Sequence, residues 1–84
     1  MGSITVIMMQ ITIAKVHENL FQGEAQSVTA PTVDGEVTVL SKHEPLVTTL
    51  KPGTVTVRTV GGTHEFSVTD GVLEVSNDQA TVLL

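Results

Sequence analysis

The sequence predicts an all-β domain, and three observations lead to this fold class. Val, Ile and Thr account for 31 of the 84 residues, and their β-branched side chains favour strands over helices. Turn signals rich in Gly, Pro, Asn and Asp recur roughly every 8–12 residues, the spacing typical of a sandwich or a barrel. No segment keeps a helical spacing of apolar residues for more than about one turn. A chain of 84 residues has room for a single domain.

Eight short runs between the turn signals are the predicted strands. In chain order they are residues 4–16, 24–30, 36–40, 46–50, 54–60, 63–68, 72–75 and 79–84. The turn signals between them are Gln22-Gly23, Pro31 with Asp34-Gly35, Pro45, Pro52-Gly53, Gly61-Gly62, Asp70-Gly71 and Asn77-Asp78. Each signal contains a residue type that favours tight turns. We expect the domain to span residues 1–84, with part of residues 1–8 added by cloning, because Met8 and Met9 are alternative native starts.

One hairpin is regular enough for its register to be predicted. Gly61-Gly62 lies between two alternating runs and is interpreted as a two-residue loop of type I′ or II′. The predicted pairs are Val60 with Thr63, Arg58 with Glu65, Val57 with Phe66 and Val55 with Val68. This register gives the hairpin one mainly apolar face and one polar face, as a half-buried hairpin requires.

Composition makes several function classes improbable. Lys and Arg number 4 against 9 for Asp and Glu, so the formal net charge is −5. Such a surface repels phosphate groups, and the chain has no Trp or Tyr on which bases could stack, so no nucleic-acid partner is expected. The same charge argues against docking on anionic lipid. Without Cys there is no disulfide, and no apolar run approaches the ~18 residues of a membrane-spanning helix, so no direct membrane insertion is expected.

The histidines do not form a metal-binding motif. His17, His43 and His64 are too far apart in the sequence to match a known ligand spacing. They are interpreted as surface or core-edge residues, and neither a metal nor a cofactor is expected.

The sequence Asp34-Gly35-Glu36 places two carboxylates close together and leaves three interpretations. A calcium loop needs more oxygen ligands in succession than this, and paired-carboxylate catalysis needs a substrate cleft. A turn at Asp34-Gly35 with a solvated flank is favoured over catalysis, while a polar contact loop for a partner stays open. Since there is no Gly-x-Ser-x-Gly motif, the residues alone predict a non-enzymatic interaction module.

Five segments, in order, resemble a known family. They are Leu20-Phe21-Gln22-Gly23 through Pro31, then Asp34-Gly35-Glu36 through Lys42-His43-Glu44-Pro45-Leu46-Val47, then Leu50-Lys51-Pro52-Gly53, then Asp70-Gly71-Val72-Leu73-Glu74-Val75, and finally Ala80-Thr81-Val82-Leu83. Together they resemble the N-terminal domain of the epsilon subunit of F-type ATP synthase. Each segment alone is weakly specific, and the five in this order cover nearly the whole chain.

The resemblance implies a fold, a role and a location. The fold is a small two-layer β-sandwich of about ten short strands. The role is that of a non-catalytic rotor-stalk subunit that links the gamma subunit to the c ring and couples ion translocation to ATP synthesis. The location is peripheral, in the F1 sector at the cytoplasmic face of the bacterial inner membrane. An unrelated small β-sandwich that binds a ligand or a peptide is the alternative, and an enzyme is the last choice.

The resemblance also implies partner-binding residues. The loop that contacts the c ring corresponds to Val33, Asp34, Gly35 and Glu36, and the surface that contacts gamma includes His43 and Thr48. Two departures from the family pattern are the charged residues beside His43 and the Asp70-Gly71 pair in place of Gly-Gly. Most members carry a C-terminal helical hairpin that restrains ATP hydrolysis, so no hairpin-based inhibition is expected from residues 1–84.

Overall fold

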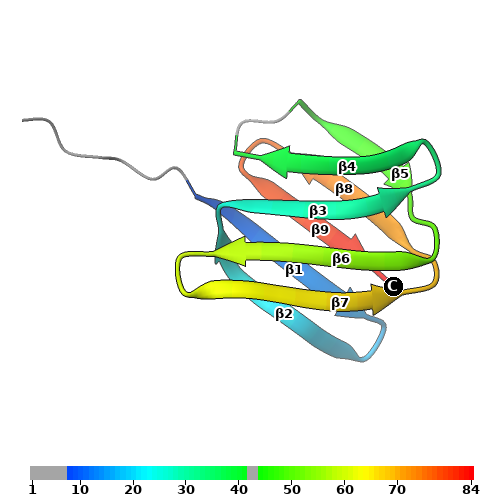
Figure 1. The fold of residues 1–84 in the computed structure, drawn as a ribbon, viewed down its shortest axis with the longest axis horizontal. Helices are drawn as coiled ribbons and strands as arrows, with labels where there is room; N and C mark the ends of the chain where they lie inside the picture. The colour runs from blue at the N-terminus through cyan, green and yellow to red at the C-terminus, as the bar shows by residue number, and fades with distance from the viewer. Residues whose placement is uncertain (1–7, 42–43) are drawn as a thin grey trace, which may run out of the picture.

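Nine strands in two sheets build the protein in a computed structural model, which describes residues 8–41 and 44–84 (Figure 1). The strands are β1 (Met9–Lys15), β2 (Glu18–Ala25), β3 (Ser27–Thr32), β4 (Gly35–Leu40), β5 (Leu46–Thr49), β6 (Gly53–Thr59), β7 (Gly62–Val68), β8 (Val72–Ser76) and β9 (Gln79–Leu83). The prediction of an all-β fold is confirmed. Over this same part of the chain, no helix is long and apolar enough to cross a membrane.

The two sheets lie face to face as the layers of a sandwich (Figure 1). One sheet has five strands in the order β2-β1-β9-β8-β5, and the other has four in the order β4-β3-β6-β7. Neighbouring strands are antiparallel except β1 and β9, which run parallel. Successive strands reverse direction, so the connections fall alternately at the two ends of the sandwich.

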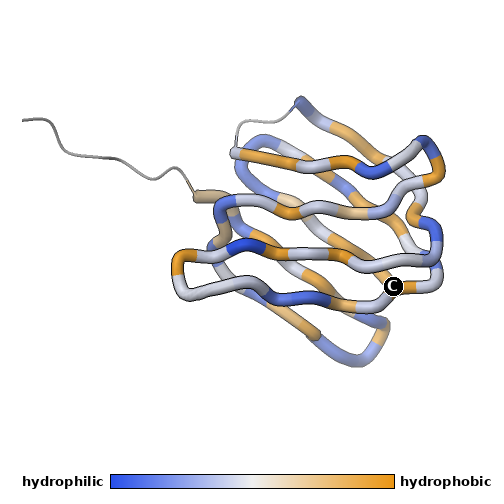
Figure 2. The backbone as a smooth tube through the Cα atoms, in the orientation of Figure 1, coloured by the Kyte–Doolittle hydropathy of each residue, from blue (hydrophilic) through white to orange (hydrophobic). Residues whose placement is uncertain are grey.

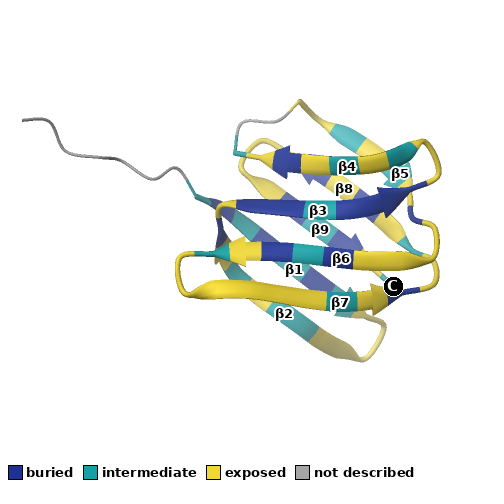
Figure 3. Ribbon diagram, in the orientation of Figure 1, coloured by how far each residue is buried: buried dark blue, intermediate teal, exposed yellow. Residues whose placement is uncertain are grey.

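The core lies between the sheets and consists of small aliphatic side chains. Apolar and polar positions alternate along the strands (Figure 2), since successive side chains of a strand point to opposite faces. The buried hydrophobic residues are Met9, Ile11, Ile13, Ala25, Val28, Ala30, Val39, Leu50, Val55, Val57, Val68, Leu73, Val75, Ala80 and Val82. Figure 3 shows that β3, inside the four-stranded sheet, is mostly buried while the edge strand β7 is mostly exposed.

The sequence prediction missed β2, and the expected turn at Gln22-Gly23 is wrong. Gly23 lies within the β1–β2 ladder opposite Ile11, and the chain reverses at Val16 and His17 instead. A single Gly inside a strand is tolerated, so it gave a false turn signal. The predicted strand 24–30 is interrupted at Gln26, which separates β2 from β3. The start of the predicted run 4–16 lies outside the described residues.

The predicted register of the β6–β7 hairpin is wrong by two residues. The loop is Val60-Gly61, with Thr59 opposite Gly62 and Val57 opposite His64. Gly62 has a positive φ of 146° and Val60 does not, because a β-branched residue disfavours that region, so the loop is not a primed turn. A shift of two residues leaves every side chain on its predicted face. The apolar pattern therefore could not distinguish the two registers.

The corrected register also changes the predicted partners of Arg58 and Glu65. Arg58 lies opposite Thr63, and Glu65 lies opposite Thr56. The predicted direct cross-strand pair between Arg58 and Glu65 is therefore absent.

An aromatic cluster closes one side of the sandwich, where the edge strands β2 and β7 approach each other. The Phe21 ring lies 5.2 Å from the His64 ring and 6.1 Å from the Phe66 ring, measured between centroids. Both contacts are tilted or edge-on, which is the favoured geometry for aromatic pairs.

Candidate functional site

The candidate site is the tip of the β3–β4 hairpin, residues 33–36, called the contact loop below. Val33 and Asp34 connect the two strands, and Gly35 and Glu36 begin β4. The Val33 side chain is 59% exposed, and Asp34 and Glu36 are exposed as well. The turn predicted at Asp34-Gly35 thus exists one residue earlier, at Val33-Asp34, and the loop presents one apolar side chain and two carboxylates to solvent.

A buried hydroxyl fixes the backbone of the contact loop. Thr32 is 0% exposed, and its Oγ1 donates a hydrogen bond to the Gly35 carbonyl oxygen at 2.6 Å. The same oxygen accepts a hydrogen bond from the Asp34 amide at 3.2 Å. One hydroxyl can donate once and accept as well, so both bonds form together. The peptide groups before Asp34 and before Glu36 are therefore both held by Thr32.

Gly35 is required where the loop enters β4. Its φ is +115°, a conformation that residues with a Cβ rarely adopt. An added Cβ would meet nothing within 4 Å. The requirement is therefore conformational and does not come from crowding.

The contact loop is also bonded to the second sheet. The Val33 amide donates to the Thr49 carbonyl oxygen of β5 at 3.0 Å, and Thr32 forms an isolated β-bridge with Leu50. The Lys51 amide donates to the Pro31 carbonyl oxygen at 2.9 Å. The loop therefore has backbone bonds to both layers of the sandwich, and we call this end of the molecule the anchored end.

The β5–β6 connection packs closely beneath the loop. An added Cβ on Gly53 would lie 2.9 Å from the Pro31 Cγ, which is closer than real Cβ contacts. The Leu50 amide donates to the Gly71 carbonyl oxygen at 2.8 Å, which extends the bonding to the β7–β8 connection. The Pro52-Gly53 and Asp70-Gly71 signals of the sequence thus meet at the anchored end.

Thr48, one of the two residues predicted to contact gamma, lies close to the contact loop. Thr48 lies in β5, is half-buried and pairs with Leu73 of β8. The following residue, Thr49, accepts the Val33 amide, so the contact loop and the β5 edge strand are directly connected. Val47 of the same strand is 69% exposed. His43 lies outside the described residues.

The remaining histidines lie apart from the contact loop. His17 is exposed in the β1–β2 turn, and the His64 ring makes a tilted contact with the Phe21 ring, away from the contact loop. In residues 8–41 and 44–84 no group of three or more His, Cys, Asp or Glu residues could hold a metal ion.

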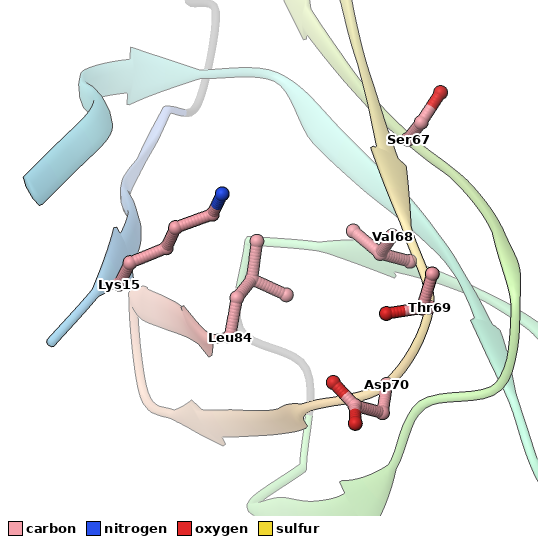
Figure 4. A pocket seen from close by; sticks show the side chains of 6 residues that line it. All are labelled: Lys15, Ser67, Val68, Thr69, Asp70 and Leu84. Atoms are coloured by element: carbon pink, nitrogen blue, oxygen red, sulfur yellow. The ribbon is translucent and has the colours of Figure 1, made fainter.

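One shallow cavity of about 260 Å³ lies near the end of β9 (Figure 4). Its lining residues are Lys15, Ser67, Val68, Thr69, Asp70 and Leu84. Figure 4 shows the Lys15 ammonium and the Asp70 carboxylate on different walls, with the Leu84 side chain between them. The volume is below the ~300–1,000 Å³ of typical small-molecule sites.

Sequence reasoning missed Thr32, although a signal was present. In Thr-Val-Asp-Gly the Thr hydroxyl is two residues before the Asp amide, a spacing at which Ser and Thr side chains bond local backbone. Its burial could not be predicted, because Thr32 forms a β-bridge with Leu50, a residue far away in the sequence.

Fold and site together define a small β-sandwich with a hydrogen-bonded loop at one end that exposes two carboxylates. The comparisons give the family: the chain belongs to the β-sandwich domains of the ATP synthase delta/epsilon chain, which match residues 8–84. The resemblance inferred from the five sequence segments is thereby confirmed.

Curated relatives carry the same description. The ATP synthase epsilon chain of Hydrogenovibrio crunogenus is 44% identical over 79 residues, which is 92% of this chain and 54% of that protein. The epsilon chain of Neisseria meningitidis is 38% identical over 77 residues, covering 89% of this chain and 55% of that protein. The chain thus spans about half the length of the curated relatives it matches.

Solved structures give the same fold. A chain in the Euglena gracilis mitochondrial ATP synthase structure of OSCP, F1 and c ring superposes with a TM-score of 0.84 at 26% identity, covering 98% of this chain and 52% of that one. A chain in the Tetrahymena thermophila central stalk and c-ring structure superposes with a TM-score of 0.75 at 17% identity, covering 89% and 61%.

Proposed function

We propose that this β-sandwich is a non-catalytic part of the central stalk of an ATP synthase, where it connects the gamma subunit to the c ring. Family membership supports this role, as do the curated relatives named as epsilon chains. The Euglena structure with which the chain superposes contains a c ring. The proposed location is peripheral, at the cytoplasmic face of the bacterial inner membrane.

The proposed c-ring contact is the contact loop, and this loop is the observation that carries the proposal. It presents Asp34 and Glu36 in solvent on a backbone that Thr32 and the second sheet hold in place. Carboxylates on a rigid loop fit basic or amide groups of polar c-subunit loops, and such charges contribute more to orientation than to affinity. A preformed loop also loses little conformational entropy on binding.

The proposed gamma contact is the surface around Thr48, with His43 carried by the family resemblance. Thr48 belongs to the edge strand β5, which has a strand neighbour on one side only. The bond from Val33 to Thr49 joins this strand to the contact loop. A force applied at the proposed gamma contact would therefore be transmitted to the proposed c-ring contact through a short, hydrogen-bonded path. Coupling between gamma and the c ring requires such a path.

Binding measurements with the two purified partners test the proposal. Gamma and the c ring of the same organism are titrated separately against the immobilised chain. Glu36→Gln is expected to weaken c-ring binding about tenfold, equal to ~1.4 kcal/mol, and to leave gamma binding unchanged. Thr48→Ala is expected to weaken gamma binding only. Glu18→Gln and Thr63→Ala are the matched controls, because both residues are exposed on β2 and β7, away from the contact loop. No binding of either partner at micromolar concentration would refute the proposal.

The alternative of an unrelated binding module is not supported, since the family is shown. The absence of hairpin-based inhibition stays a prediction, because that property belongs to residues beyond the β-sandwich.

A further inference from the structure

We propose that Thr32 is a positioning residue for partner binding: its buried hydroxyl sets the direction in which the Asp34 and Glu36 carboxylates leave the contact loop. This inference rests on the proposed function, because it assigns a consequence for c-ring binding to a residue that does not itself reach the surface. Thr32 is 0% exposed, so no partner can contact its side chain directly.

The geometry gives one oxygen atom control over two peptide groups. Thr32 Oγ1 accepts the Asp34 amide, which fixes the peptide group between Val33 and Asp34. It donates to the Gly35 carbonyl, which fixes the peptide group between Gly35 and Glu36. Each of these peptide groups directly precedes a residue that carries a carboxylate. Their orientation therefore sets the Cα–Cβ directions of both acidic residues.

Solvent cannot readily replace this hydroxyl. Both bonds are part-buried, and Thr32, which forms a β-bridge with Leu50 after the end of β5, is 0% exposed. Every buried side-chain N or O atom in the described ranges has a hydrogen-bond partner. Removal of the hydroxyl would leave the Asp34 amide and the Gly35 carbonyl without this partner, and the loop would move to satisfy them elsewhere.

The β6–β7 hairpin provides a control within the same molecule. Its loop has the sequence Thr59-Val60-Gly61-Gly62, and the Thr59 hydroxyl donates to the Gly62 carbonyl oxygen at 2.9 Å. This bond is solvent-exposed, and the loop carries no acidic residue. The Thr32 hydroxyl also accepts a hydrogen bond from the Asp34 amide. Within the described ranges, the Thr59 hydroxyl accepts no corresponding bond from the Gly61 amide. Thr59→Val therefore removes a similar hydroxyl without changing a proposed contact.

The test combines c-ring affinity with a double-mutant cycle. Thr32→Val keeps the shape of the side chain and removes the hydroxyl, whereas Thr32→Ser keeps the hydroxyl. We expect Thr32→Val to weaken c-ring binding about tenfold, and Thr32→Ser and Thr59→Val to stay within about twofold of the unmodified chain. Because Thr32 acts through Glu36 as well as through Asp34, the double variant Thr32→Val with Glu36→Gln is expected to lose clearly less binding than the product of the two single losses. Independent effects would instead multiply to about a hundredfold loss.

A second measurement covers the case in which Thr32→Val does not fold. Amide hydrogen exchange of the unmodified chain is expected to be at least about tenfold slower at Asp34 than at Gly61, since only Asp34 bonds to a buried oxygen. Equal exchange rates at the two amides would overturn the inference.

The remaining outcomes separate the two claims. Unchanged c-ring binding by folded Thr32→Val, an equal loss in Thr59→Val, or a multiplicative double variant would each overturn the positioning role while the proposed function stands. If the unmodified chain does not bind the c ring, the proposed function fails and the positioning role fails with it.

Discussion

The β3–β4 and β6–β7 hairpins have nearly the same turn and very different surroundings. Both consist of Thr, Val, a variable residue and Gly, both place a positive φ at that Gly, and both have the Thr hydroxyl bonded to its carbonyl. They lie at opposite ends of the sandwich (Figure 1). Among the residues that the structure describes, only the first is bonded to the other sheet, through Val33 and Thr49. Similar local sequence thus produces an anchored loop at one end and a free loop at the other, and tertiary contacts make the difference.

The largest expected effect is at the anchored end, in Gly71→Ala. Gly71 has a φ of +134°, and an added Cβ would lie 2.5 Å from the Leu83 carbonyl oxygen. Backbone strain and overpacking together predict a loss of about 3 kcal/mol in the free energy of unfolding, measured by urea denaturation. The matched change at the free end, Gly61→Ala, is expected to cost less than about 0.5 kcal/mol, because its nearest neighbour would be 3.9 Å away. Equal losses would mean that the two ends do not differ in packing.

A smaller effect is expected at the aromatic cluster, where side-chain contacts join β7 to β2 of the other sheet. Phe66 is half-buried and its ring meets Phe21 edge-on. Full burial would predict a loss of ~3–5 kcal/mol for Phe66→Ala, and half-burial lowers the expected loss to about 2 kcal/mol. Val60→Ala at the 72% exposed tip of the β6–β7 hairpin is the control, with an expected change below about 0.5 kcal/mol. A loss below about 1 kcal/mol for Phe66→Ala would show that the aromatic cluster does not hold this hairpin.

The stability of the two loops can be compared directly by removing the Thr32 and Thr59 hydroxyls in turn. Thr32→Val is expected to lower the free energy of unfolding by about 1–2 kcal/mol, because two part-buried backbone groups lose their partner. Thr59→Val is expected to cost less than about 0.5 kcal/mol, because water can replace its exposed bond. Thermal unfolding followed by circular dichroism measures both. A larger loss in Thr59→Val would reverse the assignment of the anchored end.

The fold class could be predicted from the sequence, but only part of the candidate site could. Alternating Val and Thr made the strands predictable, since period-2 burial follows from strand geometry. The register of β6–β7 was not predictable, because a two-residue shift preserves both faces. β2 was missed because Gly23 gives a turn signal that its pairing with Ile11 overrides. Thr32 forms a β-bridge with Leu50, which is eighteen positions away in the sequence, and no local pattern reveals that pairing.

The smallest expected effect on stability comes from an exchange of the variable loop residues. Gly61 has no positive φ, and the nearest atom to an added Cβ, Thr59 Oγ1, would be 3.9 Å away, an ordinary contact, so Gly61→Asp should fit without strain. Reduced freedom of the unfolded chain predicts a change of at most about +0.5 kcal/mol in the free energy of unfolding, and Asp34→Gly should change it by a similar amount in the opposite direction. Differential scanning calorimetry of the two variants and of their combination measures these shifts.

The same exchange tests whether c-ring binding depends on the residues of the loop alone or also on the hydrogen bonds that hold its backbone. If sequence alone made the contact loop, Gly61→Asp together with Thr63→Glu would transfer c-ring binding to the free end and would compensate for Asp34→Gly. We expect no such transfer, because the free end lacks the bond to the second sheet and the buried hydroxyl. Recovery of c-ring binding in the combined variant would show that the anchored surroundings are irrelevant and that the carboxylate alone is recognised.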